Sequence, residues 1–191
     1  MKQYNSFVFV RFQIIILFAS LSLWGCHPQV HITPTEIEVN SPKDKLLAGV
    51  SVALKNAETD SSEYIIINMQ RPSDDMFRTN KRACIDMILN GLNKGLNDRG
   101  ARVVQEAPCV VTLTIQEVAK KTVGMGTVKC YSTVNVTVGS RLKKAYQGEG
   151  AAADVGKVGA GPTIALNRSL SDVVTHMLTD EEFLSVLKAG K

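Results

Sequence analysis

Two stretches in the middle of the chain alternate apolar and polar residues, which is the pattern of a half-buried β-strand. Their apolar positions are Val111, Leu113 and Ile115 in the first stretch and Val134, Val136 and Val138 in the second. Gly124 and Met125 lie midway, where a hairpin turn favours glycine. A fold at this point keeps both apolar sets on one face of the sheet. It pairs Val111 with Val138, Leu113 with Val136 and Ile115 with Val134, so the pattern predicts a central hairpin over 109–142.

Shorter apolar runs predict further strands beside this hairpin. The segment Ala48–Lys55 alternates, and β-branched residues fill Tyr64–Asn68. Two more strands are predicted within Ala101–Gln105 and Ala145–Asp154. Together with the hairpin, these segments predict an antiparallel sheet of about five or six strands.

Two other stretches repeat apolar residues every three or four positions, as an amphipathic helix requires. The first helix is predicted over about 76–99, with helix-start residues at Ser73–Asp75 and Gly100 after its end. The second is predicted over about 163–178, and the capping-box sequence Thr179–Glu182 starts a short C-terminal helix. The apolar stripes are Ile85, Ile88, Leu89, Leu92 and Leu96 in the first helix, and Leu166, Leu170, Val173, Val174, Met177 and Leu178 in the second.

These elements predict an α+β fold in which the sheet is packed on one face by the two main helices. Gly91 and Gly95 lie inside the first helix, where each glycine costs about 1 kcal/mol relative to alanine. They share one flank of the helix, and their small size lets another backbone approach closely. We interpret them as a contact with the C-terminal helix or the sheet of the same domain. A contact with another subunit is the alternative.

The amino terminus has the organisation of an export signal. Lys2 and Arg11 are followed by an uncharged run from Phe12 to Trp24, and then by Gly25 and Cys26. This sequence resembles the lipobox of bacterial lipoproteins. The resemblance implies cleavage before Cys26, acylation of that cysteine with fatty acids such as palmitate, and a location outside the cytoplasm.

The competing interpretation of the amino terminus is an uncleaved membrane helix. Such a helix needs about 20 mostly apolar residues, whereas the uninterrupted run after Arg11 has 13. His27 follows the cysteine, where lipoproteins retained in the inner membrane have aspartate. The resemblance therefore implies the periplasmic face of the outer membrane.

Three regions follow from this organisation. Residues 1–25 are expected to be a lipoprotein signal peptide, 26–47 a lipidated N terminus and tether, and 48–191 a single periplasmic domain. The tether contains three prolines, and a short edge strand at Ile37 and Val39 is the alternative there.

Charge and cysteine content exclude several classes of function. The formal net charge is +4, and it falls to +2 when Lys2 and Arg11 leave with the signal, so a nucleic-acid-binding surface is not expected. Cys84, Cys109 and Cys130 remain beside Cys26. An odd number permits at most one internal disulfide, and the hairpin register separates Cys109 from Cys130, so such a bond must use Cys84. Their spacing matches no zinc pattern, and we expect no metal or cofactor.

No arrangement of residues predicts catalysis. The segment Gly150–Lys157 has the wrong spacing for a phosphate-binding loop. The acidic pairs Asp74–Asp75 and Glu181–Glu182 lie at predicted helix starts, where negative charge interacts favourably with the positive end of the helix dipole. We therefore expect a protein that is not an enzyme. Two basic clusters, Lys120, Lys121 and Lys129 and then Arg141, Lys143 and Lys144, are interpreted as solvated turns, with anionic headgroups or an acidic partner as the alternative.

Four segments of the mature chain carry a family resemblance. They are Glu36–Val39, Gly49–Val52, Asp98–Val103 and Phe183–Leu184. Their order resembles that of the YajG family of bacterial outer-membrane lipoproteins. The resemblance implies an envelope lipoprotein without assigned catalysis, so Cys26 is the one functional residue that it transfers to this chain.

The leading hypothesis is a non-enzymatic outer-membrane lipoprotein whose periplasmic domain binds another envelope protein. The alternative is a structural subunit of a large envelope-spanning assembly, such as the outer-membrane complex of a secretion system. A third, weaker hypothesis is a lipid or small-molecule carrier that uses the space between helix and sheet.

Overall fold

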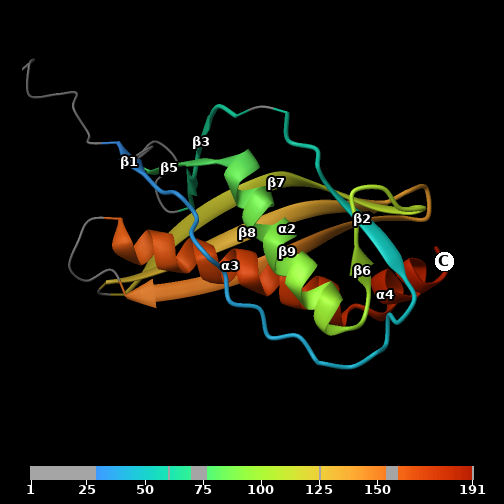
Figure 1. Ribbon diagram of the computed structural model, residues 1–191. Coiled ribbons are helices and arrows are strands. Elements are labelled where there is room, and N and C mark those ends of the chain that lie inside the picture. The colour runs from blue at the N-terminus through green and yellow to red at the C-terminus, as the bar shows by residue number, and fades with distance from the viewer. Residues whose placement is uncertain (1–28, 60, 70–76, 125, 154–158, 191) are drawn as a thin grey trace, which may run out of the picture.

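A long antiparallel meander forms the centre of the molecule. The computed structural model describes residues 29–59, 61–69, 77–124, 126–153 and 159–190. Within them, β7 (Cys109–Val123), β8 (Thr127–Val138) and β9 (Leu142–Ala153) lie side by side (Figure 1). Helices cover one face of the sheet, so the expected α+β fold is confirmed.

The predicted hairpin register is confirmed in its first half. Val111 pairs with Val138, Leu113 with Val136 and Ile115 with Val134. A β-bulge then lies between Ile115 and Glu117, and it shifts the remaining pairs by one residue. Gln116 is the extra residue in β7, and the alternating pattern before it gives no sign of the bulge. Cys130 consequently lies opposite Lys120, not opposite Ala119 as the uniform register requires.

The other strands join the meander in parallel, whereas the sequence predicted a wholly antiparallel sheet. The strand order is β6-β2-β7-β8-β9, with β2 (Ser51–Asn56) parallel to both β6 (Arg102–Val103) and β7. The short strand β4 (Ile67–Asn68) also pairs with β7 in parallel. Parallel neighbours need a crossover connection, and the chain between β2 and β7 makes one through a helix.

A second, small sheet lies at one end of the molecule. In it, β5 (Phe77–Asn80) pairs with β1 (Val30–His31) and with β3 (Glu63–Ile65). The first main helix was predicted from about residue 76, but these strand pairs occupy Phe77–Asn80. The helix α2 (Lys81–Asp98) begins after them, where the Asn80 side chain accepts a hydrogen bond from the Ala83 amide. The predicted start residues Ser73–Asp75 lie outside the described residues.

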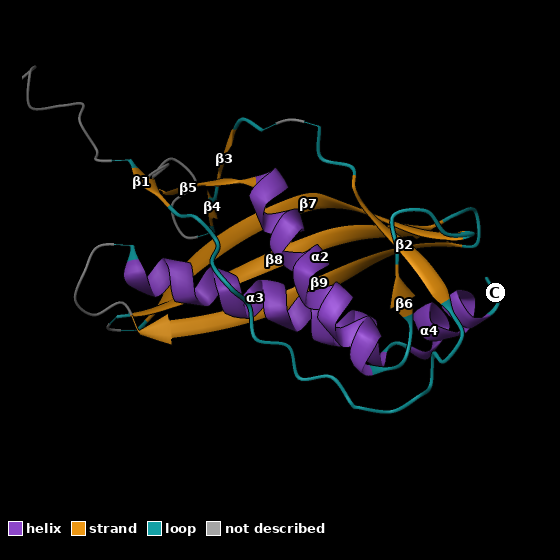
Figure 2. Cartoon of the chain, in the orientation of Figure 1, coloured by secondary structure: helices purple, strands orange, loops and turns teal. Residues whose placement is uncertain are grey.

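Two helices complete the chain, and Figure 2 shows that α2 and α3 lie on the same face of the sheet. The helix α3 (Ala160–Thr179) is followed by α4 (Glu181–Lys188). Asp180, not Thr179, caps α4 by accepting a hydrogen bond from the Glu182 amide at 2.9 Å. The apolar stripes of both main helices meet the inward-facing valines of the sheet in one core.

The backbone of α3 lies directly against β9. A Cβ atom added at Gly148 would overlap the carbonyl oxygen of Ser169, and one at Gly150 would overlap that of Ala165. Only glycine permits this approach, because any side chain would push the helix off the sheet. The space between α3 and this edge of the sheet is therefore filled by the two backbones.

The segment before β2 packs on the domain, although the sequence suggested a tether. Residues 35–39 pass beside both α2 and α3, and the chain then runs around the C-terminal end of α2 (Figure 1). Ile32, Ile37, Val39 and Leu47 are buried. Ile37 and Val39 form no ladder with another strand. Their burial against the helices makes this segment part of the folded domain.

Candidate functional site

The predicted lipidation site lies outside the part of the chain that the structure describes. Gly25 and Cys26 precede the first described strand, whose first residue is Val30. Within the described residues, no helix is long and apolar enough to cross a bilayer.

The two glycines of α2 face other parts of the same chain. A Cβ atom at Gly91 would come within 2.8 Å of Ile37 and 2.9 Å of Val39, and one at Gly95 would overlap the Leu178 side chain of α3. The hydroxyl of Ser41 also donates to the Gly95 carbonyl at 3.0 Å. Both glycines thus lie where the N-terminal segment and α3 approach α2.

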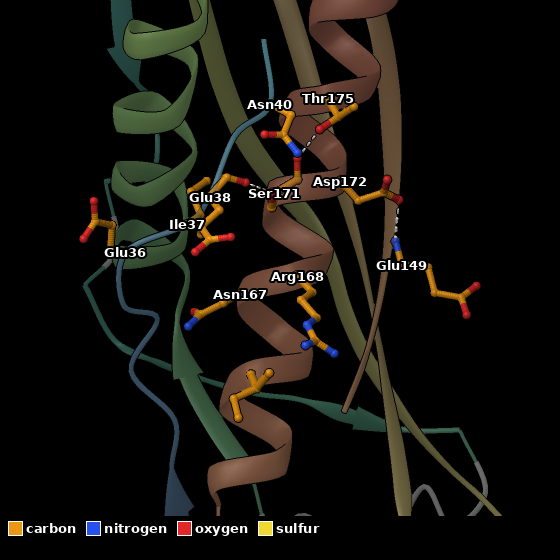
Figure 3. A pocket seen from close by; sticks show the side chains of 11 residues that line it. Glu36, Ile37, Glu38, Asn40, Glu149, Asn167, Arg168, Ser171, Asp172 and Thr175 are labelled. Atoms are coloured by element: carbon orange, nitrogen blue, oxygen red, sulfur yellow. Dashed lines mark hydrogen bonds between the residues drawn. The ribbon is translucent and has the colours of Figure 1, made fainter. Parts of the chain in front are cut away.

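An open groove runs between the N-terminal segment and α3 (Figure 3). Its volume is about 500 Å³. We call it the acidic groove. It is lined by Glu36, Ile37, Glu38, Asn40, Glu149, Ile164, Asn167, Arg168, Ser171, Asp172 and Thr175.

The N-terminal wall of the acidic groove is an extended segment with alternating sides. Ile37 and Val39 turn inward and are buried, so Glu36 and Glu38 are exposed along the rim. Two contacts with α3 fix this wall. The Thr35 amide donates to the Asn167 side chain at 3.1 Å, and the Ser171 hydroxyl donates to the Glu38 carbonyl.

The helix wall of the groove reaches the free edge of β9. Arg168 donates to the Ala151 carbonyl, Asp172 accepts from the Glu149 amide at 2.9 Å, and the His176 ring lies 2.7 Å from the Gln147 carbonyl. These side chains are four residues apart on the helix, about 6 Å, and their partners are two residues apart on the strand, about 6.6 Å. The matching repeats let α3 cover alternate backbone groups of the edge strand.

The charges of the acidic groove are unbalanced. Glu36, Glu38, Glu149 and Asp172 supply four carboxylates, and Arg168 supplies one guanidinium. Lys129, outside the lining, pairs with Glu149, so the unbalanced charge comes from Glu36 and Glu38. The Asp172 and Arg168 side chains are engaged by the β9 edge, whereas Glu36 and Glu38 are exposed. The groove is therefore suited to a cationic segment that also offers hydrogen-bond donors.

A second, smaller groove lies on the other side of the same N-terminal segment. It has a volume of about 370 Å³ and is lined by Thr35, Glu36, Ile37, Met87, Asn90, Gly91 and Lys94. Glu36 contributes to both grooves. The segment thus lies between two hollows, with helix α3 beside one and helix α2 beside the other.

The three lysines of the predicted cluster near the hairpin tip, Lys120, Lys121 and Lys129, have different surroundings. Lys120 is 7% exposed, and its ammonium lies 4.2 Å from the centre of the Phe77 ring. Lys129 pairs with Glu149 across the strands, and the hydrogen bond to Glu149 raises the lysine pKa. Lys121 is exposed. The bulge explains why Lys120 is buried and Lys121 is exposed, because it turns position 120 toward the core.

The second basic cluster contributes to the packing of α4. Lys144 lies 2.7 Å from Asp180, and the hydrogen bond to Asp180 raises the pKa of Lys144. Tyr146 donates to Asp180 as well, and its burial, followed by this hydrogen bond, raises the phenol pKa. Arg141 donates to the Ala189 carbonyl at 2.7 Å. These contacts favour a structural role over an open basic patch.

The three cysteines of the domain are buried thiols. Cys84, Cys109 and Cys130 are free. Burial raises the pKa of Cys84 to about 11 and that of Cys130 to about 12, which makes both poor nucleophiles. Among the described residues, no group of three or more His, Cys, Asp or Glu side chains is placed to hold a metal ion.

The acidic groove was not found from the sequence. Its walls come from residues 36–40 and 164–175, more than a hundred positions apart in the chain. The available signals were the alternation of Glu36 and Glu38 with buried residues and the polar flank of α3. Both patterns are equally typical of surfaces that only contact water.

Comparisons with known proteins give partial structural likenesses. No family model and no curated protein matches the chain. XCC0632 from Xanthomonas campestris, a DUF330 protein, is 14% identical, with 79% of this chain and 90% of that one covered and a TM-score of 0.49. A structure described as an uncharacterized protein is 11% identical, with coverage of 74% and 97% and a TM-score of 0.38. The PelC dodecamer from Paraburkholderia phytofirmans is 16% identical, with coverage of 73% and 92% and a TM-score of 0.30.

Proposed function

We propose that this protein is a non-enzymatic lipoprotein of the outer membrane, anchored through Cys26, and that its periplasmic domain binds another envelope protein in the acidic groove. The lipobox-like sequence Leu23–Cys26 supports the anchor. The segments that resemble the YajG lipoproteins support the envelope location, and membership of that family is part of the proposal.

The observation that carries the binding role is the open, polar character of the groove. A site for a small ligand is normally enclosed and mostly apolar. This groove is open along α3, and the exposed carboxylates of Glu36 and Glu38 stand on its rim. A protein segment that carries lysine or arginine matches this charge and shape.

The carrier hypothesis finds no support in the contact between α3 and β9. A carrier that uses the space between helix and sheet needs an apolar cavity there. Gly148 and Gly150 instead place the backbone of α3 against the strand. The groove outside this contact is the feature that remains available to a partner.

The anchor would strengthen such a contact. A lipid on Cys26 confines the domain to a thin layer beside the membrane, which raises its effective concentration for partners in the same layer. A groove whose own contacts are weak can then be occupied. The same reasoning applies to the alternative, a subunit of a large envelope-spanning assembly.

The test is co-purification from native membranes in mild detergent with matched charge reversals. Glu38→Lys places a cation on the rim of the groove, and Glu106→Lys makes the same change at an exposed position that lines none of the grooves described above. We expect the wild type and Glu106→Lys to retain a defined partner protein and Glu38→Lys to lose it. Thermal unfolding of both variants controls for folding.

Two results would contradict the binding role. One is the absence of any partner in the wild-type preparation, and the other is equal recovery of the partner with both variants. Size analysis of the extracted complex separates the alternatives, since a subunit of an envelope-spanning assembly migrates in a very large particle.

A further inference from the structure

We propose that one end of the domain rests on the surface of the phospholipid bilayer. This end consists of Met69, the hairpin tip Lys121–Thr127 without the undescribed residue 125, and the first turn of α3, and we call it the membrane-facing end. The proposal rests on the lipid anchor at Cys26 and adds to it an orientation and a contact surface.

Three of the four exposed large apolar side chains of the described residues belong to elements at this end. Within the described residues, four such side chains are exposed: Met69 at 56%, Ile164 at 45%, Leu46 at 41% and Val123 at 40%. Single exposed apolar side chains are ordinary, so their placement is what matters. Met69, Val123 and Ile164 belong to elements that meet at the same end of the sheet. Leu46 precedes Leu47, whose amide donates to the Arg99 carbonyl at the C-terminal end of α2.

One hydrogen bond places Met69 beside β7, near the hairpin tip. The Met69 amide donates to the Lys120 carbonyl at 2.9 Å. Val123 follows Lys120 by three residues in the same strand, which is about 10 Å. It closes the hairpin by pairing with Thr127.

The first turn of α3 lies at the same level of the sheet. The Cys130 thiol, which lies opposite Lys120, donates to the Pro162 carbonyl at 3.8 Å. Ile164 is two residues further along α3 and is exposed. Figure 1 shows the start of α3 near the C-terminal ends of β7 and β9, at the same end of the molecule as β1.

The length of chain after the anchor brings this end to the membrane. Val30 lies against the start of α3, since a Cβ atom at Gly159 would come within 2.9 Å of its side chain. Four residue steps join Cys26 to Val30, and they span about 14 Å at most. The 12 residues of β8 extend about 40 Å toward the other end. An anchor of this length reaches the membrane-facing end and not the opposite one.

The polar side chain best placed for headgroups is Lys121. It is exposed, and it precedes the exposed Val123 by two residues in β7, so the two side chains lie on the same face of the strand. A lysine can keep its ammonium among lipid phosphates while its alkyl stem lies on apolar surface. Lys120 and Lys129 are held by Phe77 and Glu149, so the contact does not depend on them.

A tryptophan reporter tests the orientation. The chain has one tryptophan, Trp24, which is removed with the signal, so the mature wild type has no tryptophan emission. Val123→Trp reports on the membrane-facing end, and Ser140→Trp reports on the β8–β9 turn at the opposite end. Each lipidated, full mature protein is reconstituted into vesicles of phosphatidylethanolamine and phosphatidylglycerol, with and without brominated lipid.

We expect Val123→Trp to give blue-shifted emission that brominated lipid quenches, and Ser140→Trp to give emission that it does not quench. Flotation with the vesicles is measured for both. Flotation without quenching of Val123→Trp would leave the anchor intact and overturn the orientation, as would equal quenching of both reporters. Failure to float would overturn the anchor and the orientation together.

Discussion

At the scale of single residues, glycine decides how closely α3 approaches the sheet. Gly148→Ala places a methyl group against the backbone of Ser169, which cannot move without shifting the helix. Gly91→Ala meets side chains and no backbone atom, those of Ile37 and Val39, in a segment without a strand ladder. Overpacking typically costs about 1–3 kcal/mol. We expect Gly148→Ala to reach or exceed the upper value and Gly91→Ala to stay near the lower one.

Urea denaturation of the two variants and the wild type measures this difference. An unfolding free energy for Gly148→Ala equal to that of Gly91→Ala would contradict the tight backbone contact. Gly95→Leu is a third comparison, because its side chain must displace the buried Leu178 of α3.

The buried thiols predict a pH effect. Burial raises the pKa values of Cys84 and Cys130 from 9.0 to about 11 and about 12, so the unfolded chain loses these protons first. The stability that depends on the neutral thiols is present below pH 9 and declines as the pH rises toward these values. At pH 8 we expect little reaction of native protein with a thiol reagent.

Thiol counting after denaturation without reductant completes this test. The expected count is three, from Cys84, Cys109 and Cys130, since the sulfur of Cys26 carries lipid. A count of one would reveal a disulfide, and a count of four would reveal an unmodified Cys26.

At the scale of elements, the row Arg168, Asp172 and His176 covers the edge of β9. An uncovered edge strand can pair with another strand and so promote association. Replacement of all three by alanine should increase concentration-dependent association, measured by sedimentation velocity. The matched control is Arg82, Asp86 and Asn90 on α2, which have the same spacing and are exposed. Equal association of both triple variants would show that the row does not protect the edge.

The sequence predicted the elements that depend on local periodicity. The alternation of Val111–Ile115 and Val134–Val138, with a turn between, was enough to give their pairing. The bulge after Ile115 was not predicted, because one extra residue leaves the apolar pattern on either side intact. The parallel pairing of β2 was also missed, since it depends on the crossover through α2 and not on the strand itself.

The start of α2 shows tertiary contacts overriding a local signal. Phe77–Asn80 precedes a helical pattern and has no breaker, yet it pairs with β1 and β3. The acidic groove shows the same limit for a site. Glu38 and Ser171 meet only because the segment around Glu38 packs beside α3, and nothing near either residue in the sequence indicates that contact.

At the scale of the whole molecule, the N-terminal segment would join the proposed lipid anchor to the acidic groove. From Val30, at the end proposed to face the membrane, the chain continues into one wall of the acidic groove with Glu36 and Glu38. A partner in this groove would therefore contact the domain close to the bilayer. The proposed lipid, orientation and partner site would then all depend on one short stretch of chain.

The most direct test of this account is mass spectrometry of the intact protein purified from its native membranes. The account predicts a polypeptide that begins at Cys26, with its mass raised by thioether-linked and amide-linked acyl chains. Cys26→Ser should instead accumulate as uncleaved, unlipidated precursor. A native protein that still begins at Met1, with no added lipid mass, would contradict the central claim.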